Sequence, residues 1–193
     1  MRIVTYRRAI NSFALYKSPG VDGIFPALLQ KAQEVVIPHL VRIFCACLLT
    51  GYVPAVWGQV KVVFIPKPNR NCYSGPRDYR PNSLTSFFLK TLERLVDKYL
   101  RDVALGLVPL HSNQCAYQTG KSVETALHQL MVRVEKVLDQ QETSLGVLLD
   151  TEGAFNNTCY DAMCDALVGH GSEYTIVQRI RATWLWQPSI EHL

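Results

Sequence analysis

Asp150 is the residue whose position points most directly to chemistry. It follows an apolar run, Leu145–Leu149, and precedes Glu152 and the small residues Gly153 and Ala154. An aspartate at the carboxyl end of a strand lies where ligands of open α/β sheets gather. A carboxylate beside small residues also suits a Mg²⁺ ion that binds phosphate oxygens. The same pattern is typical of a turn or a helix cap, so this position alone leaves both interpretations open.

A basic loop over residues 66–81 is the second chemical feature. Lys67 follows Pro66 and Arg80 precedes Pro81, so neighbouring prolines restrict both backbones. Two such cations could clamp a triphosphate, because arginine offers a planar fork of donors and lysine a point charge. The plainer interpretation is an exposed loop whose charge keeps it solvated.

A phosphate clamp and a metal-binding carboxylate are half of a phosphoryl-transfer site. Two-metal sites hold their cations ~3.5–4 Å apart and normally need further carboxylates. The sequence contains no adjacent pair of aspartates. Asp161 and Asp165 lie four residues apart on an expected helix, where solvation of the helix surface explains them better than catalysis.

Composition sets the limits on the class of protein. The 193 residues are 48% hydrophobic and 19% charged, which excludes a disordered or collagen-like chain. No apolar run approaches the ~20 residues of a bilayer span, and the N-terminus lacks the apolar core of a signal peptide. The six cysteines form no C-x-x-C pair and are interpreted as reduced thiols. We therefore expect an intracellular protein, cytoplasmic or nuclear, with no membrane partner.

Charge is divided unevenly along the chain. Residues 1–121 hold 16 Lys and Arg against 6 Asp and Glu, whereas residues 122–193 hold 4 against 10. This division indicates either chance clustering of surface charge or a basic surface for a polyanion beside a site that holds cations.

Hydrophobic periodicity and turn residues predict an α+β chain that is largely helical with a few short strands. The expected helices cover residues 26–49 (interrupted at Pro38 and ended by Gly51), 85–103, a stretch from Ser122, 159–168 and a stretch from Ser172, and the expected strands cover 60–65 and 145–149. Ser122, Ser172 and the pair Thr158 and Asp161 are the expected caps. The buried face expected on the helix after Ser122 consists of Val123, Ala126, Leu127, Leu130, Val134, Val137 and Leu138.

Seven short segments occur in an order and at a spacing that resemble one known family. They are Lys17-Ser-Pro-Gly-Val-Asp-Gly-Ile, Gly51-Tyr-Val-Pro-Ala-Val-Trp, Ile65-Pro-Lys-Pro, Asp78-Tyr-Arg-Pro-Asn-Ser-Leu, Leu89-Lys-Thr-Leu-Glu-Arg-Leu, Gln114-Cys-Ala-Tyr-Gln-Thr-Gly-Lys-Ser and Leu148-Leu-Asp-Thr-Glu-Gly-Ala-Phe. Together they resemble the reverse transcriptase domain of non-LTR (LINE-type, jockey-like) retrotransposons. The resemblance covers nearly the whole chain.

The resemblance implies the front part of a right-hand polymerase. Residues 1–16 would be a lead-in helix or tail, 17–121 a fingers-like region and 122–193 the start of a palm. The implied reaction is RNA-directed DNA synthesis, in which a primer 3′-OH attacks a dNTP on an RNA template. Two-metal chemistry with Mg²⁺, or with Mn²⁺ in its place, is implied for the complete enzyme.

The resemblance also assigns roles to individual residues. Lys67 and Arg80 would grip the incoming dNTP, and Phe155 would form the aromatic floor under its ribose. Asp150 would be the first catalytic aspartate and a metal ligand, helped by the backbone carbonyl of Thr151. Arg77 and Lys121 would contact nucleic acid, although capping alone explains the neighbouring Ser122.

The sequence departs from the family pattern at several positions. Asn82 stands where isoleucine is usual, Thr151 where Ile or Leu is frequent, and Asn156 where an aspartate normally ends the motif. The Gly-rich segment and the Tyr/Phe-x-Asp-Asp turn of the family do not occur before Leu193. We therefore expect a truncated, inactive chain that self-associates through an unpaired strand at 145–149. A non-catalytic nucleic-acid-binding remnant and a decayed open reading frame are the alternatives.

Overall fold

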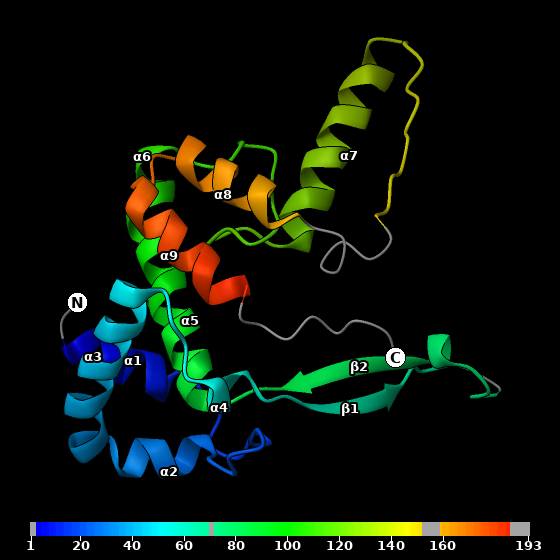
Figure 1. Ribbon diagram of the computed structural model, residues 1–193. Coiled ribbons are helices and arrows are strands. Elements are labelled where there is room, and N and C mark those ends of the chain that lie inside the picture. Colours follow the sequence, from blue (N-terminus) through cyan, green and yellow to red (C-terminus); the bar gives the residue numbers. More distant parts are fainter. Residues whose placement is uncertain (1–2, 70–71, 152–158, 186–193) are drawn as a thin grey trace.

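The computed structural model describes residues 3–69, 72–151 and 159–185 (Figure 1). Its elements are α1 (Ile3–Asn11), α2 (Pro26–Lys31), α3 (Gln33–Thr50), α4 (Ala55–Gly58), β1 (Lys61–Pro66), the 3₁₀ turn η1 (Pro76–Asp78), β2 (Tyr79–Leu84), α5 (Phe87–Tyr99), the π-helical turn η2 (Leu100–Ala104), α6 (Leu105–Leu107), α7 (Val123–Asp139), α8 (Tyr160–Gly169) and α9 (Tyr174–Leu185). The described chain is thus largely helical with one small sheet, in agreement with the expected α+β composition.

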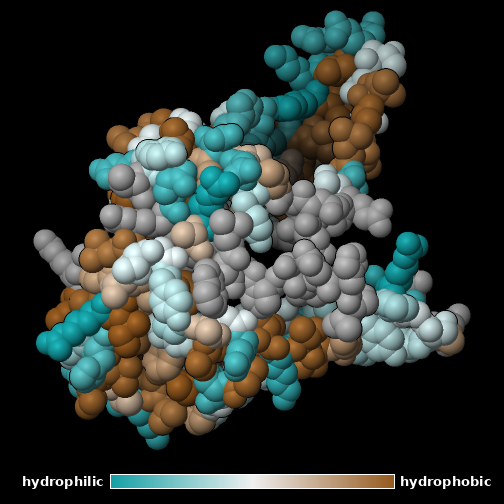
Figure 2. All heavy atoms as spheres, viewed as in Figure 1, coloured by the Kyte–Doolittle hydropathy of each residue, from teal (hydrophilic) through white to brown (hydrophobic). Residues whose placement is uncertain are grey.

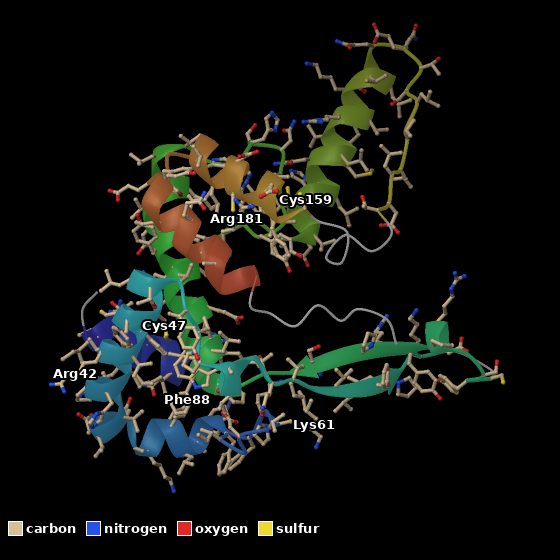
Figure 3. The ribbon with its side chains drawn as sticks, viewed as in Figure 1. Arg42, Cys47, Lys61, Phe88, Cys159 and Arg181 are labelled. Atoms are coloured by element: carbon tan, nitrogen blue, oxygen red, sulfur yellow. The ribbon has the colours of Figure 1, made fainter. Side chains whose placement is uncertain are left out.

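The core lies between α1, α2, α3, α4 and α5. An aromatic chain runs through it: the Phe44 ring stacks on Tyr6 with centroids 6.0 Å apart and meets the Trp57 ring edge-on at 5.7 Å. The Trp57 ring in turn stacks on Phe88 at 5.7 Å. Figure 3 shows Cys47 of α3 directed towards this core. Offset and edge-on aromatic pairs add to the burial energy of such a core.

Pro38 predicts either two helices or one kinked helix over 26–49, and the structure has two; they separate at Ala32, however, and Pro38 lies within α3. The Gln30 side chain donates to the carbonyls of Ile10, at 3.2 Å, and Phe13, at 2.9 Å, and these bonds tie α2 to the end of α1. A proline within the early turns of a helix removes one backbone bond, which buried neighbours can offset. The direction of α2 is therefore set by its anchor on α1.

Helix α3 ends as expected at Gly51, whose φ of 67° lies in the left-handed region. Helix α3 has 18 residues and a mean hydropathy of 1.4, which makes it long and apolar enough to cross a membrane by length and composition only. Its buried side chains form one stripe, Ile37, Leu40, Phe44 and Cys47. The core helix of a soluble protein has the same character, so this helix is weak grounds for a membrane span.

Strands β1 and β2 form an antiparallel hairpin that extends away from the helices (Figure 1). Strand β1 confirms the expected strand at 60–65 to within a residue. Strand β2 corrects the expectation that the loop runs to residue 81, since it begins at Tyr79 and contains Pro81 opposite Phe64. Proline is tolerated here because both strands of a two-stranded sheet are edges.

Helix α5 follows the hairpin directly. The Ser86 hydroxyl accepts a bond from the Phe88 amide at 3.1 Å, which caps the helix. Leu92 and Leu95 of α5 face the core, each only 1% exposed. The sequence predicts that this helix ends near residue 103. In the structure, helical turns continue beyond Tyr99 through η2 and α6.

Helix α7 begins where expected, because the Ser122 hydroxyl accepts a bond from the Thr125 amide. Its expected buried face is nevertheless exposed: Leu127 is 56% exposed and Leu130 is 53% exposed. The segment that follows α7 is also apolar and exposed (Figure 2). A stripe is buried only where another element covers it, and in the described chain no element is packed on this one.

The final two helices pack against each other, and α9 also packs against α3. Helix α8 agrees with the prediction for 159–168, although its expected cap Thr158 lies outside the described residues. Val177 and Ile180 of α9 are buried. The expected cap at Ser172 is wrong, since its hydroxyl has no hydrogen-bond partner in the part of the chain that the structure describes.

Candidate functional site

The β1–β2 hairpin places the two predicted triphosphate-binding cations on one face. Arg80 lies opposite Ile65 in the register, and the Lys67 amide donates to the Asp78 carbonyl at 2.8 Å. Lys67 is two residues beyond Ile65, so side-chain alternation directs both cations to the same side of the ribbon. They are diagonal neighbours, a relation that places two residues ~7–8 Å apart, with their Cβ atoms somewhat closer.

These cations are available to an anionic ligand. Arg77 and Arg80 are exposed and Lys67 is half-buried. None of the three has an ion-pair partner among residues 3–69, 72–151 and 159–185. Unpaired cations gathered on a projecting hairpin produce a positive potential that attracts phosphate groups.

The end of the hairpin is an organised turn. The Gly75 amide donates to Asp78 Oδ2 at 3.0 Å, and the Asp78 amide donates back to the Gly75 carbonyl at 3.0 Å. The Tyr73 hydroxyl donates to the Lys67 carbonyl at 2.9 Å. These bonds hold the backbone on both sides of Arg77, so this cation is carried by an ordered segment.

Lys121, predicted to contact nucleic acid, has a structural use. Its Nζ donates to the Ser112 carbonyl at 2.6 Å and to the Gln114 carbonyl at 3.0 Å. Nearby, Arg101 donates to the Tyr117 carbonyl at 2.8 Å. The two cations thus hold the loop before α7, and the charge of Lys121 is largely satisfied by that loop.

Asp150 does not lie at the end of a strand, so the prediction of a strand at 145–149 is wrong. The segment has no regular structure, and Leu148 and Leu149 are 97% and 93% exposed. An extended segment becomes a strand only by pairing with another, and neither strand of the described chain pairs with this segment. Asp150 therefore lies on a segment that the rest of the described chain leaves unpaired.

The metal-binding prediction rests on few donors. Asp150 and Thr151 are exposed, and Phe155 lies outside the described residues. Within the described ranges, no group of three or more His, Cys, Asp or Glu side chains is placed to hold a metal ion. Asp161 forms an ion pair with Arg181 at 2.6 Å, in agreement with its interpretation as surface charge. The described donors do not complete a divalent-cation site.

Gly20 is a positioning residue that the sequence patterns did not single out. A Cβ at this position would lie 2.8 Å from the Thr85 carbonyl carbon and 2.9 Å from the Ser86 nitrogen. The Lys17–Ile24 segment thus packs against the backbone between β2 and α5. The sequence places Gly20 in the Lys17–Ile24 family segment, but its packing partner could not be inferred from a single sequence.

The two cations whose pKa is lowered by burial, Lys90 and Arg94, lie away from the hairpin. Burial lowers the pKa of the Lys90 ammonium, and Glu93 and Asp22 partly oppose this shift. Lys90 Nζ lies 4.6 Å from the Phe87 ring centroid, and Arg94 lies 3.7 Å from that of Phe13. These cation–π contacts place both side chains at the edge of the core, where they support packing.

Comparison with known proteins identifies the family. Residues 65–168 match the model of the family described as reverse transcriptase (RNA-dependent DNA polymerase). The chain is 30% identical over 163 residues to the probable RNA-directed DNA polymerase from transposon BS of Drosophila melanogaster. It is 29% identical over 172 residues to the putative 115 kDa protein in type-1 retrotransposable element R1DM of the same organism. It is also 29% identical over 153 residues to the retrovirus-related Pol polyprotein from type-1 retrotransposable element R2 of Popillia japonica.

These alignments cover 84%, 89% and 78% of the chain, in the same order. They cover 18%, 16% and 20% of the relatives, so the chain spans about a fifth of the length of the curated proteins it matches. The matched family region begins at Ile65 near the end of β1, and it includes Lys67, all of β2, the loop before α7 and Asp150. The chain therefore belongs to the reverse transcriptase family, and its relatives are proteins of non-LTR retrotransposons.

Proposed function

We propose that this chain contributes the nucleotide-gripping hairpin and the first catalytic carboxylate of an RNA-directed DNA polymerase. In that reaction a primer 3′-OH attacks the α-phosphate of a dNTP on an RNA template, and pyrophosphate leaves. The observation that carries the proposal is the position of Lys67 and Arg80 on one face of the hairpin, without ion-pair partners in the described chain.

We assign residues 17–121 to the fingers and residues 122–193 to the start of the palm, with residues 1–16 as a lead-in. The compact packing of α1 to α5 at the base of the hairpin supports the first assignment, because a projecting two-stranded ribbon needs a rigid base. The uncovered apolar face of α7 supports the second, because such a face is typical of an element that packs against further structure.

The hairpin can bind a triphosphate by direct electrostatics. Arg80 offers a planar set of donors that matches two phosphate oxygens, and Lys67 offers a point charge beside it. Their relation as diagonal neighbours, ~7–8 Å apart, lets both long side chains converge on one polyphosphate. Lys67 and Arg80 would thereby orient the leaving pyrophosphate and neutralise part of its charge.

Reverse transcriptases use divalent metal ions, and we assign Mg²⁺, or Mn²⁺ in its place, to Asp150 and the carbonyl of Thr151. The described residues supply too few donors to complete this site, so the metal-dependent step needs ligands beyond them. We propose that the 193-residue chain alone does not extend a primer. Template-primed incorporation by the purified chain that is abolished in Asp150→Ala would refute this.

Equilibrium titration with a fluorescent dNTP at low salt tests the triphosphate grip. We expect Lys67→Gln and Arg80→Gln each to weaken binding about 5- to 10-fold, the effect of losing roughly 1–1.4 kcal/mol of charge-assisted contact. Lys61→Gln is the matched control, since Lys61 lies on the same face at the base of the hairpin (Figure 3). An equal loss in the control, or no loss in either test variant, would contradict the proposal.

A second function, nucleic-acid binding without catalysis, is favoured by a different observation. Lys67, Arg77 and Arg80 are unpaired in the described chain, whereas Asp150 lacks companion carboxylates there. Salt-dependent RNA binding with no incorporation activity, weakened in the Arg77→Gln variant, would support this function. Binding that is indifferent to neutralisation of all three cations would eliminate it.

A further inference from the structure

The face of the hairpin that carries Lys67 and Arg80 continues towards the helices (Figure 1). Arg80 lies opposite Ile65 in the register. Asn82, two residues further along β2, lies opposite Val63. Because side chains two residues apart on a strand point to the same side, Ile65, Val63 and Asn82 share the face of the two cations. This face therefore changes from charged to uncharged as it approaches the helices.

Val63 and Ile65 form an apolar strip in the uncharged part of this face. Val63 is 39% exposed and Ile65 is 46% exposed. The two residues are alternate positions of an extended strand, which makes the strip roughly 7 Å long. Small-molecule sites combine such apolar contact area with a few placed polar groups. The strip thus offers the apolar part of a site, directly beside the cations.

Asn82 supplies a polar group beside this strip. Its side chain is exposed, and it has no hydrogen-bond partner in the part of the chain that the structure describes. A carboxamide offers an acceptor oxygen and two N–H donors. Phosphate is bound more strongly by the charged side chains of Lys67 and Arg80. The uncharged carboxamide is therefore left for the hydroxyl, amino or carbonyl groups of a ligand.

The order of these groups along the face decides the kind of ligand. A matching ligand is anionic at one end, and at the other end it has an apolar surface with polar edges. A nucleoside triphosphate has this order, because its base has an apolar face and a polar edge of donors and acceptors. With its phosphates on Lys67 and Arg80, its nucleoside part can reach the apolar strip and Asn82.

We propose that Asn82 is a further nucleotide-binding residue, whose carboxamide hydrogen-bonds to the nucleoside part of the bound dNTP. The nucleoside lies on the strip of Val63 and Ile65. The inference rests on the proposed triphosphate grip and goes beyond it, since it gives the nucleotide a direction on the hairpin. The triphosphate lies towards the turn of the hairpin and the nucleoside towards the helices.

Competition against the fluorescent dNTP tests this direction, using the 193-residue chain at low salt. One competitor is an unlabelled dNTP, and the other is inorganic tripolyphosphate, which has no nucleoside. We expect Asn82→Ala to weaken binding of the dNTP about 2- to 10-fold, the effect of losing one hydrogen bond. Binding of tripolyphosphate should be unchanged, because it makes no contact with the carboxamide. The same measurement shows that the variant hairpin is intact.

Two control variants separate the hydrogen bond from general effects of substitution. Asn113→Ala makes the same change at an exposed asparagine outside the hairpin, and it should leave both affinities unchanged. Asn82→Gln keeps the carboxamide, so it should bind the dNTP more tightly than Asn82→Ala does. Equal weakening in Asn82→Ala and Asn113→Ala would count against a contact at Asn82.

A deoxyribose triphosphate that lacks the base separates the two parts of the nucleoside. If Asn82→Ala weakens this competitor as much as the dNTP, the carboxamide binds the sugar; if it weakens the dNTP alone, the carboxamide binds the base. Both results support the inference. An unchanged dNTP affinity, or an equal loss for tripolyphosphate, would overturn it, while Lys67→Gln and Arg80→Gln still test the grip. If the wild-type chain binds no dNTP, the proposed grip and this inference are both refuted.

Discussion

Replacement of Gly20 by alanine should destabilise the whole core, because the new methyl group meets backbone. Its Cβ would lie 2.8 Å from the Thr85 carbonyl carbon and 2.9 Å from the Ser86 nitrogen. Carbon atoms in favourable contact are ~3.5–4.0 Å apart, so the two segments must separate by about 0.7 Å or more. Ser86 is only 1% exposed and caps α5, so neither segment can move without disturbing packed structure.

The magnitude follows from three contributions. Overpacking of a tight site costs roughly 1–3 kcal/mol. Disturbance of the Ser86 cap adds up to about 1 kcal/mol. Alanine also restricts the unfolded chain more than glycine does, which stabilises the folded protein by about 0.4–1 kcal/mol. We therefore expect Gly20→Ala to lower the free energy of unfolding by roughly 1–3 kcal/mol.

Urea unfolding followed by far-UV circular dichroism measures this change, as a lower midpoint at unchanged slope. Gly146→Ala is the steric control, since no atom lies within 4 Å of its Cβ position, and it should change stability by less than about 0.5 kcal/mol. Gly23→Ala separates strain from crowding, because its site is open but its φ is +70°. If Gly20→Ala is no more destabilising than Gly146→Ala, the close approach of the two segments is refuted.

Three further predictions concern other elements. Ser86→Ala should lower the free energy of unfolding by about 1 kcal/mol through loss of the cap, measured in the same urea titration; an unchanged midpoint would show that the cap is dispensable. Burial, with a smaller contribution from Cys45, raises the pKa of the Tyr6 hydroxyl, so above about pH 10 the unfolded chain loses this proton first and stability falls as pH rises. Tyr6→Phe should flatten that alkaline decline, and identical pH–stability curves would count against the assignment. Lys121→Met should accelerate amide hydrogen exchange in the loop before α7, because two loop carbonyls lose their donor, and unchanged exchange would contradict the bracing role.

Features that depend on neighbouring residues were predictable from the sequence. Gly51 ends α3, Ser122 caps α7 and β1 occupies the β-branched run, as local conformational preferences indicate. Family membership is of the same kind, because it rests on short segments in linear order and agrees with the match over residues 65–168. The residue types of the proposed phosphate-binding pair, Lys67 and Arg80, were also available at this level.

Features that depend on distant partners were not predictable. The packing of α2 on α1 involves a bond from Gln30 to the carbonyl of Ile10, and β2 exists because β1 offers it a partner despite Pro81. The segment 145–149 has strand-forming residues and no partner strand in the described chain. The stripe of α7 is apolar in sequence and exposed in structure for the same reason.

The candidate site has properties of both kinds, those that depend on the linear sequence and those that depend on distant contacts. The linear order of the residues is enough to tell which of them carry charge, which are aromatic and to which family the chain belongs. Contact between distant segments is needed to place Lys67 and Arg80 on one face, to pair Tyr73 with Tyr79 on the other, and to use the charge of Lys121 within its own loop. Side-chain chemistry is a property of each residue, whereas register and hydrogen-bond partners arise only when the chain folds back on itself.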